Sequence, residues 1–315
     1  MGVARIPEER ALTPMTHEWI VDFIGEDAFA KLAQKLKPSE LQSVLLEIVR
    51  ARAKSRSPAD VLAQYQRDAF CGPALVNPRV GLEIETELFN AAEGFEAIEL
   101  SPVAPLGACS TIAPTDQNRV LSALRSTEVA ADPTNVLALE CALRLRADNT
   151  TPAHFVTSQR VVRVQAARPV PGFSQHFRLF ALASGGVEAV DHGFTVEAMV
   201  RQVNVLLAAL DRLEKRGYAF GARRVEVLAT PERAELGDRI AERLDPHSSR
   251  AALDHPYYSG GLRFKLWVTA SDGAELALGD GGTFDWLARL AGNRRAVFAA
   301  SALGSQLIPI RFAWP

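Results

Sequence analysis

The strongest constraint on the fold is a change of hydrophobic period at about residue 158. From there apolar side chains recur at every second position, with Val162 and Val164 on one side and Arg163 and Gln165 on the other. A loop with two prolines separates this run from a second one at 176–183. Two such runs joined by a loop predict an antiparallel hairpin.

Strands and helices alternate along the rest of the chain. Helical spacing and start signals predict helices at 77–92, 134–145, 195–216 (with Thr195 as its cap) and from Pro231, and residues 116–125 are compatible with another. Period-two patterns and turn signals predict strands at 95–100, 224–228, 262–268, 276–278 and 296–303, with a glycine-rich turn at 279–282 before a short helix at Thr283. Hairpins with interspersed helices predict an α+β fold, an antiparallel sheet flanked by helices.

The first 75 residues have a different character. Ser39-Glu40-Leu41-Gln42 is interpreted as a capping box before a helix, and Ser57-Pro58 as the start of the next. We interpret residues 1–75 as a helical extension and 76–315 as the core. The alternative, in which residues 1–75 are part of the core, stays open.

Composition limits the class of protein. The chain has 315 residues and a formal net charge of -2, so it lacks the basic surplus typical of proteins that bind tRNA. Its three cysteines form no CxxC pair, which argues against a disulfide framework or a zinc site. No signal peptide and no apolar run long enough for a membrane span is evident. We therefore expect a cytoplasmic protein without membrane or tRNA partners.

Common nucleotide and metalloprotease motifs are missing from the sequence. It contains no GxGxxG, no GxxxxGK[ST] and no HExxH. A Rossmann or P-loop nucleotide site is therefore not expected.

The hairpin carries an arginine in a distinctive setting. Its first strand contains Val162-Arg163-Val164-Gln165, and Gly172-Phe173-Ser174-Gln175-His176-Phe177 leads into the second. This pattern resembles motif 2 of class II aminoacyl-tRNA synthetases, the histidyl branch in particular. The resemblance implies that Arg163 grips the α-phosphate and the amino-acid carboxylate, a task suited to the fixed charged fork of a guanidinium.

Several side chains depart from the family pattern. The resemblance implies that Gln165 takes the place of a glutamate, that Phe173 and Gln175 replace arginines, and that Gln306 stands at the motif 3 arginine. Leu179 and Ala183 likewise replace residues that read the substrate histidine.

A second segment, Ala131-Asp132-Pro133-Thr134, resembles the family's Arg-Pro-Glu-x-Thr stretch. The resemblance implies that Asp132 and Thr134 hold a ligand amino group, a charge-assisted contact. The alternative is that Asp132 only caps the helix that follows it.

A third segment, Tyr257-Tyr258-Ser259-Gly260, resembles the Tyr-Tyr-Thr-Gly of the histidyl enzymes and of the ATP phosphoribosyltransferase regulatory subunit. The resemblance implies that Tyr257 and Tyr258 line the ligand pocket. Gly281 and Gly282 match a Gly-Gly pair of the family and are expected beside them. The tyrosines could instead be core or loop filler.

The helix from Pro78 and the strand ending at Pro102 resemble motif 1, which implies a homodimer through that surface. Taken alone, the segment is better explained as an ordinary helix-turn-strand. No anticodon-binding domain is expected after the core. The resemblance as a whole covers residues 78–308.

Three hypotheses follow. The first is a non-catalytic paralogue that binds a small-molecule ligand or a partner enzyme subunit. The second is an ATP- and magnesium-dependent adenylate-forming enzyme acting on a non-tRNA acceptor, with Arg168, Arg178 or Arg263 replacing lost arginines. The third is a purely structural subunit. A full arginine clamp in the folded site would favour the enzyme, whereas a pocket without cations, lined by Asp132 and the tyrosine pair, would favour a sensor.

Overall fold

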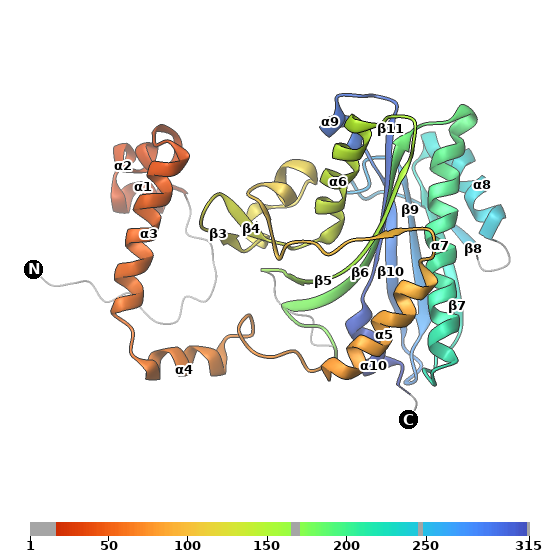
Figure 1. The fold of residues 1–315 in the computed structure, drawn as a ribbon, viewed down its shortest axis with the longest axis horizontal. Helices are drawn as coiled ribbons and strands as arrows, with labels where there is room; N and C mark the ends of the chain where they lie inside the picture. The colour runs from red at the N-terminus through yellow and green to blue at the C-terminus, as the bar shows by residue number, and fades with distance from the viewer. Residues whose placement is uncertain (1–16, 165–170, 245–247, 314–315) are drawn as a thin grey trace, which may run out of the picture. The chain divides into compact units, whose positions relative to one another are not determined.

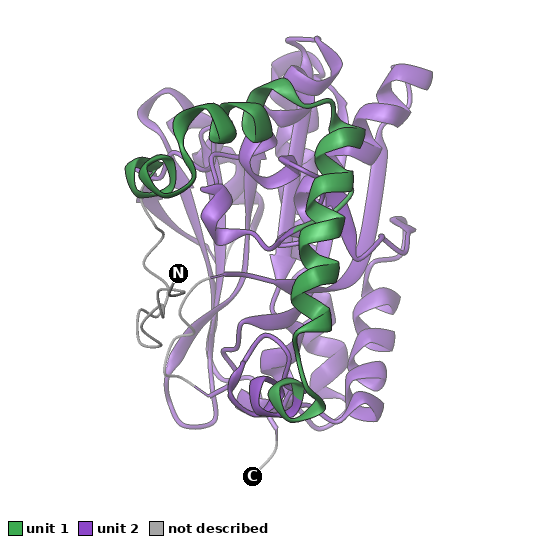
Figure 2. Cartoon of the chain, turned by 90° about the vertical axis from the view of Figure 1, so that its left-hand side faces the viewer, with its two compact units in different colours: residues 1–61, 123–126 green, residues 62–122, 127–315 purple. Residues whose placement is uncertain are grey.

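The computed structural model describes residues 17–164, 171–244 and 248–313. The chain forms two compact units, one of residues 1–61 and 123–126 and the other of residues 62–122 and 127–315 (Figure 2). Each is described by itself. The predicted boundary at residue 75 stays a prediction.

The first unit is helical where it is described. It contains α1 (His17–Ile24), α2 (Glu26–Ala30), a π-helical turn (Lys31–Lys35) and α3 (Pro38–Lys54), after which α4 (Pro58–Arg67) begins. The predicted capping box starts two residues earlier than expected, because Lys37 is the N-cap and its backbone N–H donates to Glu40 at 2.9 Å. The cap predicted at Ser57 is confirmed, since its hydroxyl accepts from the backbone N–H of Asp60 at 3.2 Å.

The second unit is built on an eight-stranded sheet with the order β1-β5-β6-β11-β10-β9-β7-β8. All neighbours are antiparallel except β1 on β5 and β8 on β7, which are parallel. The strands span Glu96–Ala97 (β1), Ala153–Val162 (β5), His176–Val187 (β6), Arg223–Ala229 (β7), Ser248–Ala252 (β8), Leu262–Thr269 (β9), Glu275–Phe284 (β10) and Ala296–Leu303 (β11).

Helices cover both faces of this sheet (Figure 1). They are α5 (Pro78–Ala91), α7 (Gly193–Glu214) and α8 (Ala234–Leu244) on one face, and α6 (Pro133–Ala147) and α9 (Trp286–Ala291) on the other. Phe180 and Leu182 point from β6 into the first layer, and Ala181 and Ala183 into the second. The predicted antiparallel sheet flanked by helices is confirmed.

Smaller elements complete the unit. Strands β2 (Val103–Pro105), β3 (Ser122–Ala123) and β4 (Thr127–Val129) are short, and β2 pairs with β4. A short helix, α10 (Ile308–Arg311), follows β11. Within the described residues, the stretch 190–214 containing α7 is the one helix long and apolar enough to cross a membrane, but it is mostly buried, as the core helix of a soluble protein would be.

Several sequence predictions were wrong in detail. The turn predicted at 279–282 is instead the middle of β10, and the helix after it starts at Trp286 rather than Thr283. The strand predicted at 95–100 is a strand only at Glu96 and Ala97, which pair with Phe155 and Val156 near the start of β5.

Two helix predictions also need correction. Residues 116–125 form a 3-10 turn at Gln117–Arg119 and the short strand β3 at Ser122–Ala123 in place of the predicted helix. Helix α7 starts before Thr195, whose backbone N–H and hydroxyl both donate to the carboxylate of Glu188. Glu188 therefore takes the capping role predicted for Thr195.

Candidate functional site

A cavity of about 1110 Å³ lies in the second unit, which we call the large cavity. Strands β6, β9, β10 and β11 supply one wall, and the start of α6 and the loop at 255–258 supply others. Six of the residues predicted from sequence line it: Asp132, Thr134, Arg163, Tyr257, Tyr258 and Gly281. Gly282 does not line it, and Gln165 lies outside the described residues.

Asp132 has two structural roles. One carboxylate oxygen accepts from the backbone N–H of Thr134 at 3.0 Å and from its hydroxyl at 2.7 Å, which caps α6. The other oxygen lies 3.3 Å from a guanidinium nitrogen of Arg163. The capping alternative is thus correct for one oxygen, while the second faces the cation predicted to hold ligands.

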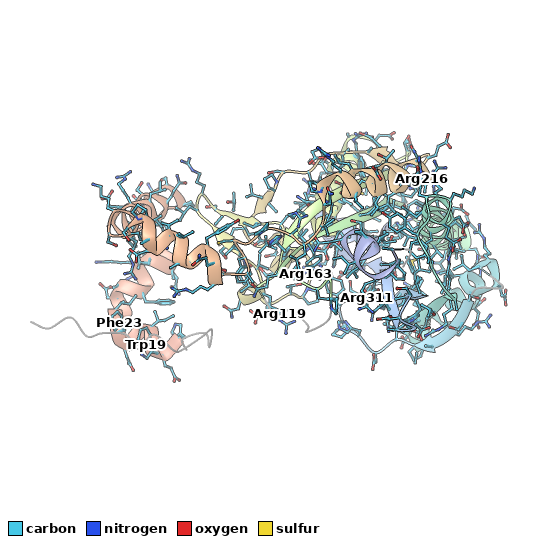
Figure 3. The ribbon with its side chains drawn as sticks, turned by 90° about the horizontal axis from the view of Figure 1, so that it is seen from below. Trp19, Phe23, Arg119, Arg163, Arg216 and Arg311 are labelled. Carbon is cyan, nitrogen blue, oxygen red and sulfur yellow. The ribbon has the colours of Figure 1, made fainter. Side chains whose placement is uncertain are left out.

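Arg163 follows the end of β5 and is held from three sides. Its Nε donates to the carbonyl oxygen of Ala131 at 2.9 Å, and its guanidinium lies 5.1 Å from the centre of the Phe177 ring. Arg119 is brought nearby because the backbone N–H of Val164 donates to its carbonyl oxygen at 2.9 Å (Figure 3). Both arginines line the large cavity.

Tyr257 stands in an aromatic wall. Its ring makes edge contacts with Tyr258, Phe284 and Trp286, with centroids 5.3–5.6 Å apart. Burial, and next the charge of Asp132, raise the pKa of the Tyr257 hydroxyl well above its usual value. The hydroxyl therefore stays protonated at neutral pH and can donate a hydrogen bond inside the cavity.

Tyr258 belongs to a hydrogen-bonded cluster on the same wall. Its hydroxyl donates to Asp280 at 2.7 Å, and Arg263 donates to both oxygens of that carboxylate, at 3.0 and 2.5 Å. The Arg263 guanidinium also lies 4.6 Å from the centre of the Tyr258 ring. Burial is the main cause that raises the pKa of Tyr258, so it too remains neutral.

The two glycines serve packing. A Cβ at Gly281 would collide with the Cβ of Ser301 and lie 2.8 Å from the Phe264 ring. One at Gly282 would collide with the carbonyl oxygen of Leu262 and meet the ring of Tyr258 at 2.5 Å. Gly282 therefore contributes to the site indirectly, because its lack of a side chain leaves room for the ring of Tyr258.

Most cations of the large cavity are neutralised by carboxylates of the same chain. Among its described lining residues, Arg163 pairs with Asp132, Arg178 with Glu85, Arg263 with Asp280 and Lys265 with Glu226, at distances of 2.5–3.5 Å. Arg119 is exposed and has no carboxylate within 4 Å in the described parts of the chain. The large cavity thus contains cations, but those in the described segments do not form a cluster of unpaired arginines that could clamp an anionic ligand.

Some residues of the site were missed by sequence reasoning. Asp280 carries the Tyr258–Arg263 cluster, and its position in a run of glycines concealed it as part of a turn. Cys109 and Asn135 also line the large cavity, and burial is the main cause that raises the Cys109 pKa to about 12. Within residues 17–164, 171–244 and 248–313, no group of three histidine, cysteine or acidic side chains is arranged to hold a metal.

Neither a protein-family model nor a curated protein sequence matches the chain. Solved structures do match it. An ATP phosphoribosyltransferase regulatory subunit/histidyl-tRNA synthetase from Bacillus halodurans has a TM-score of 0.57 at 12% identity, covering 73% of this chain and 78% of that one. Histidyl-tRNA synthetase from S. aureus gives 0.55 at 12% identity, with 75% and 67% covered. A histidine–tRNA ligase subunit from Alicyclobacillus acidocaldarius gives 0.54 at 13% identity, with 75% and 95% covered.

These likenesses confirm the predicted fold. The chain has a class II synthetase-like core of the kind found in histidyl-tRNA synthetases and in the ATP phosphoribosyltransferase regulatory subunit. At such low identity they extend to the fold alone.

Proposed function

We propose that this protein is a non-catalytic relative of the class II synthetases that binds a small, amino-acid-like ligand in the large cavity and acts as a regulatory subunit. The observation that carries the proposal is the internal pairing of Arg163, Arg178, Arg263 and Lys265 with carboxylates. Adenylate formation needs preorganised cations aimed at the charge that develops on pyrophosphate. A cation already neutralised by a neighbouring carboxylate stabilises an incoming phosphate far less.

The Asp132–Arg163 pair suits a zwitterion instead. A ligand ammonium would bind Asp132, and a ligand carboxylate would bind Arg163, so both charges stay compensated when the ligand enters. The pair is separated by 3.3 Å, longer than the about 2.7–2.9 Å of a strong charge-assisted bond. The Tyr257 hydroxyl, on which both charges act, supplies a neutral donor near the pair.

A regulatory role also requires a partner, and we propose an enzyme subunit in that position. The similar structure from Bacillus halodurans is that of an ATP phosphoribosyltransferase regulatory subunit/histidyl-tRNA synthetase, which supports the idea by fold alone. A homodimer through the segment from Pro78 to Pro102 remains part of the proposal. Leu82 on α5 is 65% exposed and is the apolar side chain we would place in that interface. Sedimentation of wild type and Leu82→Asp would test it.

The second candidate, an adenylate-forming enzyme, is favoured by one observation. The cavity of about 1110 Å³ is far larger than an amino acid, and Arg119, which lines it, has no carboxylate partner within 4 Å among the described residues. ATP with magnesium would be the cofactor in that case.

Calorimetry separates the two. ATP with magnesium, and each common amino acid, would be titrated into the purified full chain. We expect no heat with ATP and binding of one amino acid or a small group of them. Micromolar ATP binding that tightens with one amino acid, followed by pyrophosphate exchange, would establish the enzyme.

A matched pair of variants locates the ligand. Asp132→Asn keeps a good helix cap but removes the negative charge, so it should weaken amino-acid binding roughly 10-fold or more. Asp148→Asn, at the other end of α6, is the control and should bind as wild type. Equal affinity in all three proteins would move the ligand away from Asp132.

A further inference from the structure

A second cavity, of about 220 Å³, lies between the start of α5 and the residues around Ser305; we call it the small cavity. Pro78 and Gly81 line it from the first turn of α5. Arg160 and Arg178 line it from the sheet. Arg178 and Gln306 also line the large cavity, so the two cavities share a wall.

The two arginines face each other directly. Arg160 on β5 and Arg178 on β6 are paired residues of the antiparallel ladder. Like charges in this position repel, which makes the pair costly unless an anion lies between them. The electrostatics agree, because burial and then the charge of Arg178 lower the pKa of Arg160.

Among the described residues, Arg160 makes no ion pair within 4 Å, and Glu85 acts on its charge only from farther away. One of its guanidinium nitrogens lies 3.1 Å from Nδ1 of His176 and 3.1 Å from the side-chain oxygen of Gln306. Nε2 of His176 lies 2.8 Å from the carbonyl oxygen of Gly72, which can only accept, so Nε2 carries the proton and Nδ1 accepts from Arg160. Both partners of Arg160 are therefore neutral.

One carboxylate is present for two guanidinium groups. Glu85 on α5, the acidic residue among the described lining of the small cavity, lies 2.9 Å from Nε of Arg178. Burial raises the pKa of Glu85, and Arg178 only partly offsets that effect. The small cavity thus has an excess positive charge, and the positive end of the α5 helix dipole adds to it.

We propose that the small cavity is a binding site for a small oxyanion such as inorganic phosphate, held between Arg160 and Arg178. Arginine forks match the oxygen spacing of such an anion, and the cavity has room for it. Arg178 keeps Glu85 on its Nε and Nη1, at 2.9 and 3.3 Å, and would offer Nη2 to an anion held mainly by Arg160; because Arg178 also lines the large cavity, occupancy of the small cavity changes the electrostatics of the large one. The inference does not depend on the ligand proposed for the large cavity.

The test is titration of inorganic phosphate into the full chain by calorimetry, at constant ionic strength set with sodium chloride. Wild type should bind phosphate. Arg160→Gln should weaken binding roughly 10- to 100-fold, the loss expected for a charge-assisted contact. Glu85→Gln should tighten it, because the competing carboxylate is removed while the side-chain shape is kept.

Two controls fix the location. Arg146→Gln changes an exposed arginine that reaches only the carbonyl oxygen of Leu290 and should bind as wild type. Arg243→Gln changes an exposed arginine of α8 that pairs with Glu197, outside the lining of both cavities, and should also bind as wild type. Absence of phosphate binding by wild type, or weaker binding by Glu85→Gln, would overturn the proposal. So would an unchanged affinity in Arg160→Gln.

Discussion

The Tyr258 hydroxyl donates to the same oxygen of Asp280 that Nε of Arg263 reaches, at 2.7 and 3.0 Å respectively. The side chains of Arg263 and Asp280 are 17% and 37% exposed, so the pair is only partly screened by water. Replacing Asp280 with alanine leaves a half-buried guanidinium and a buried hydroxyl without their acceptor. We expect a loss of about 1–3 kcal/mol in the free energy of unfolding, measured by urea denaturation.

Glu275→Ala is the control for that variant. Glu275 accepts two hydrogen bonds from Arg224, but both side chains are more than 40% exposed. Exposed pairs contribute little, so this loss should stay below about 1 kcal/mol. Equal losses in both variants would mean that the Tyr258 cluster is no more than a surface ion pair.

His154 predicts a pH dependence of stability. Burial, and next the charge of Arg201, lower its pKa from 6.5 to about 4. Its Nδ1 lies 2.9 Å from the hydroxyl of Ser184, and its ring contacts Phe95 and Phe194, while Glu197 acts weakly in the opposite direction. His154 is therefore neutral in the folded protein at neutral pH.

The sign follows from linkage. In the unfolded chain His154 takes up a proton below about pH 6.5, whereas in the folded chain it does so only near pH 4. The contribution of His154 to the free energy of unfolding is therefore complete above pH 6.5 and is lost as the pH falls from 6.5 toward 4. The slope is at most about 1.4 kcal/mol per pH unit. Urea unfolding at pH 7 and pH 5 should show a smaller difference for His154→Gln than for wild type. An identical difference would mean that carboxylates alone produce the effect.

Gly281→Ala tests the close approach of β10 to its neighbours. The added methyl group meets Ser301, Phe264 and a backbone carbonyl, so we expect a loss of about 1–3 kcal/mol from overpacking. Gly81→Ala is the matched control, because nothing lies within 4 Å of its Cβ and it sits inside α5. It should be neutral or stabilise by about 0.5–1 kcal/mol. Similar melting temperatures for both variants would contradict the packing argument.

The three thiols should differ in reactivity. Cys71 is exposed, whereas Cys109 and Cys141 are buried, and burial raises the pKa of each buried thiol to about 12. In a thiol-titration assay at pH 8, the native protein should react at Cys71 alone, and all three should react in urea. Fast reaction of Cys109 in the native protein would contradict this prediction and would show that the reagent reaches its thiol through the large cavity.

The fold could be predicted largely from hydrophobic period. Strands β9 and β11 and helices α5 and α6 were predicted within a few residues. Strand β9 and helix α5 each bury one regular face, whereas β11 is a mostly apolar run buried on both faces of the sheet. The errors arose where residues elsewhere in the chain determine the local structure. Glu188 caps α7 from outside the helix, and the glycines of β10 follow from what lies across the sheet. The helix predicted at 116–125 stops at Arg119, because Val120 is extended and Ser122–Ala123 form β3. Arg125 and Ser126 then turn the chain with positive φ angles (67° and 53°), and no glycine marks that turn in the sequence.

The site was predicted in part for a similar reason. Arg163, Asp132 and the tyrosine pair could be placed from motif spacing, and the structure brings them to one cavity. Their pairing could not be foreseen, because the carboxylates come from the cap of α6, from α5 and from a diagonal position on the neighbouring strand, which only the folded chain brings together. Glu85 and Asp280 are far from Arg178 and Arg263 along the chain but within 2.9 and 2.5 Å in space.

Asp132 joins the cap of α6 to the wall of the large cavity, and this has a consequence for how occupancy would be transmitted. A cation that draws the carboxylate inward competes with the backbone N–H of Thr134 for the same side chain. The first turn of α6 would then fray or tighten with occupancy, and its amide protons would exchange with solvent at a rate that reports the bound fraction. If the proposed ligand binds Asp132, amide exchange in the first turn of α6 should therefore change with occupancy.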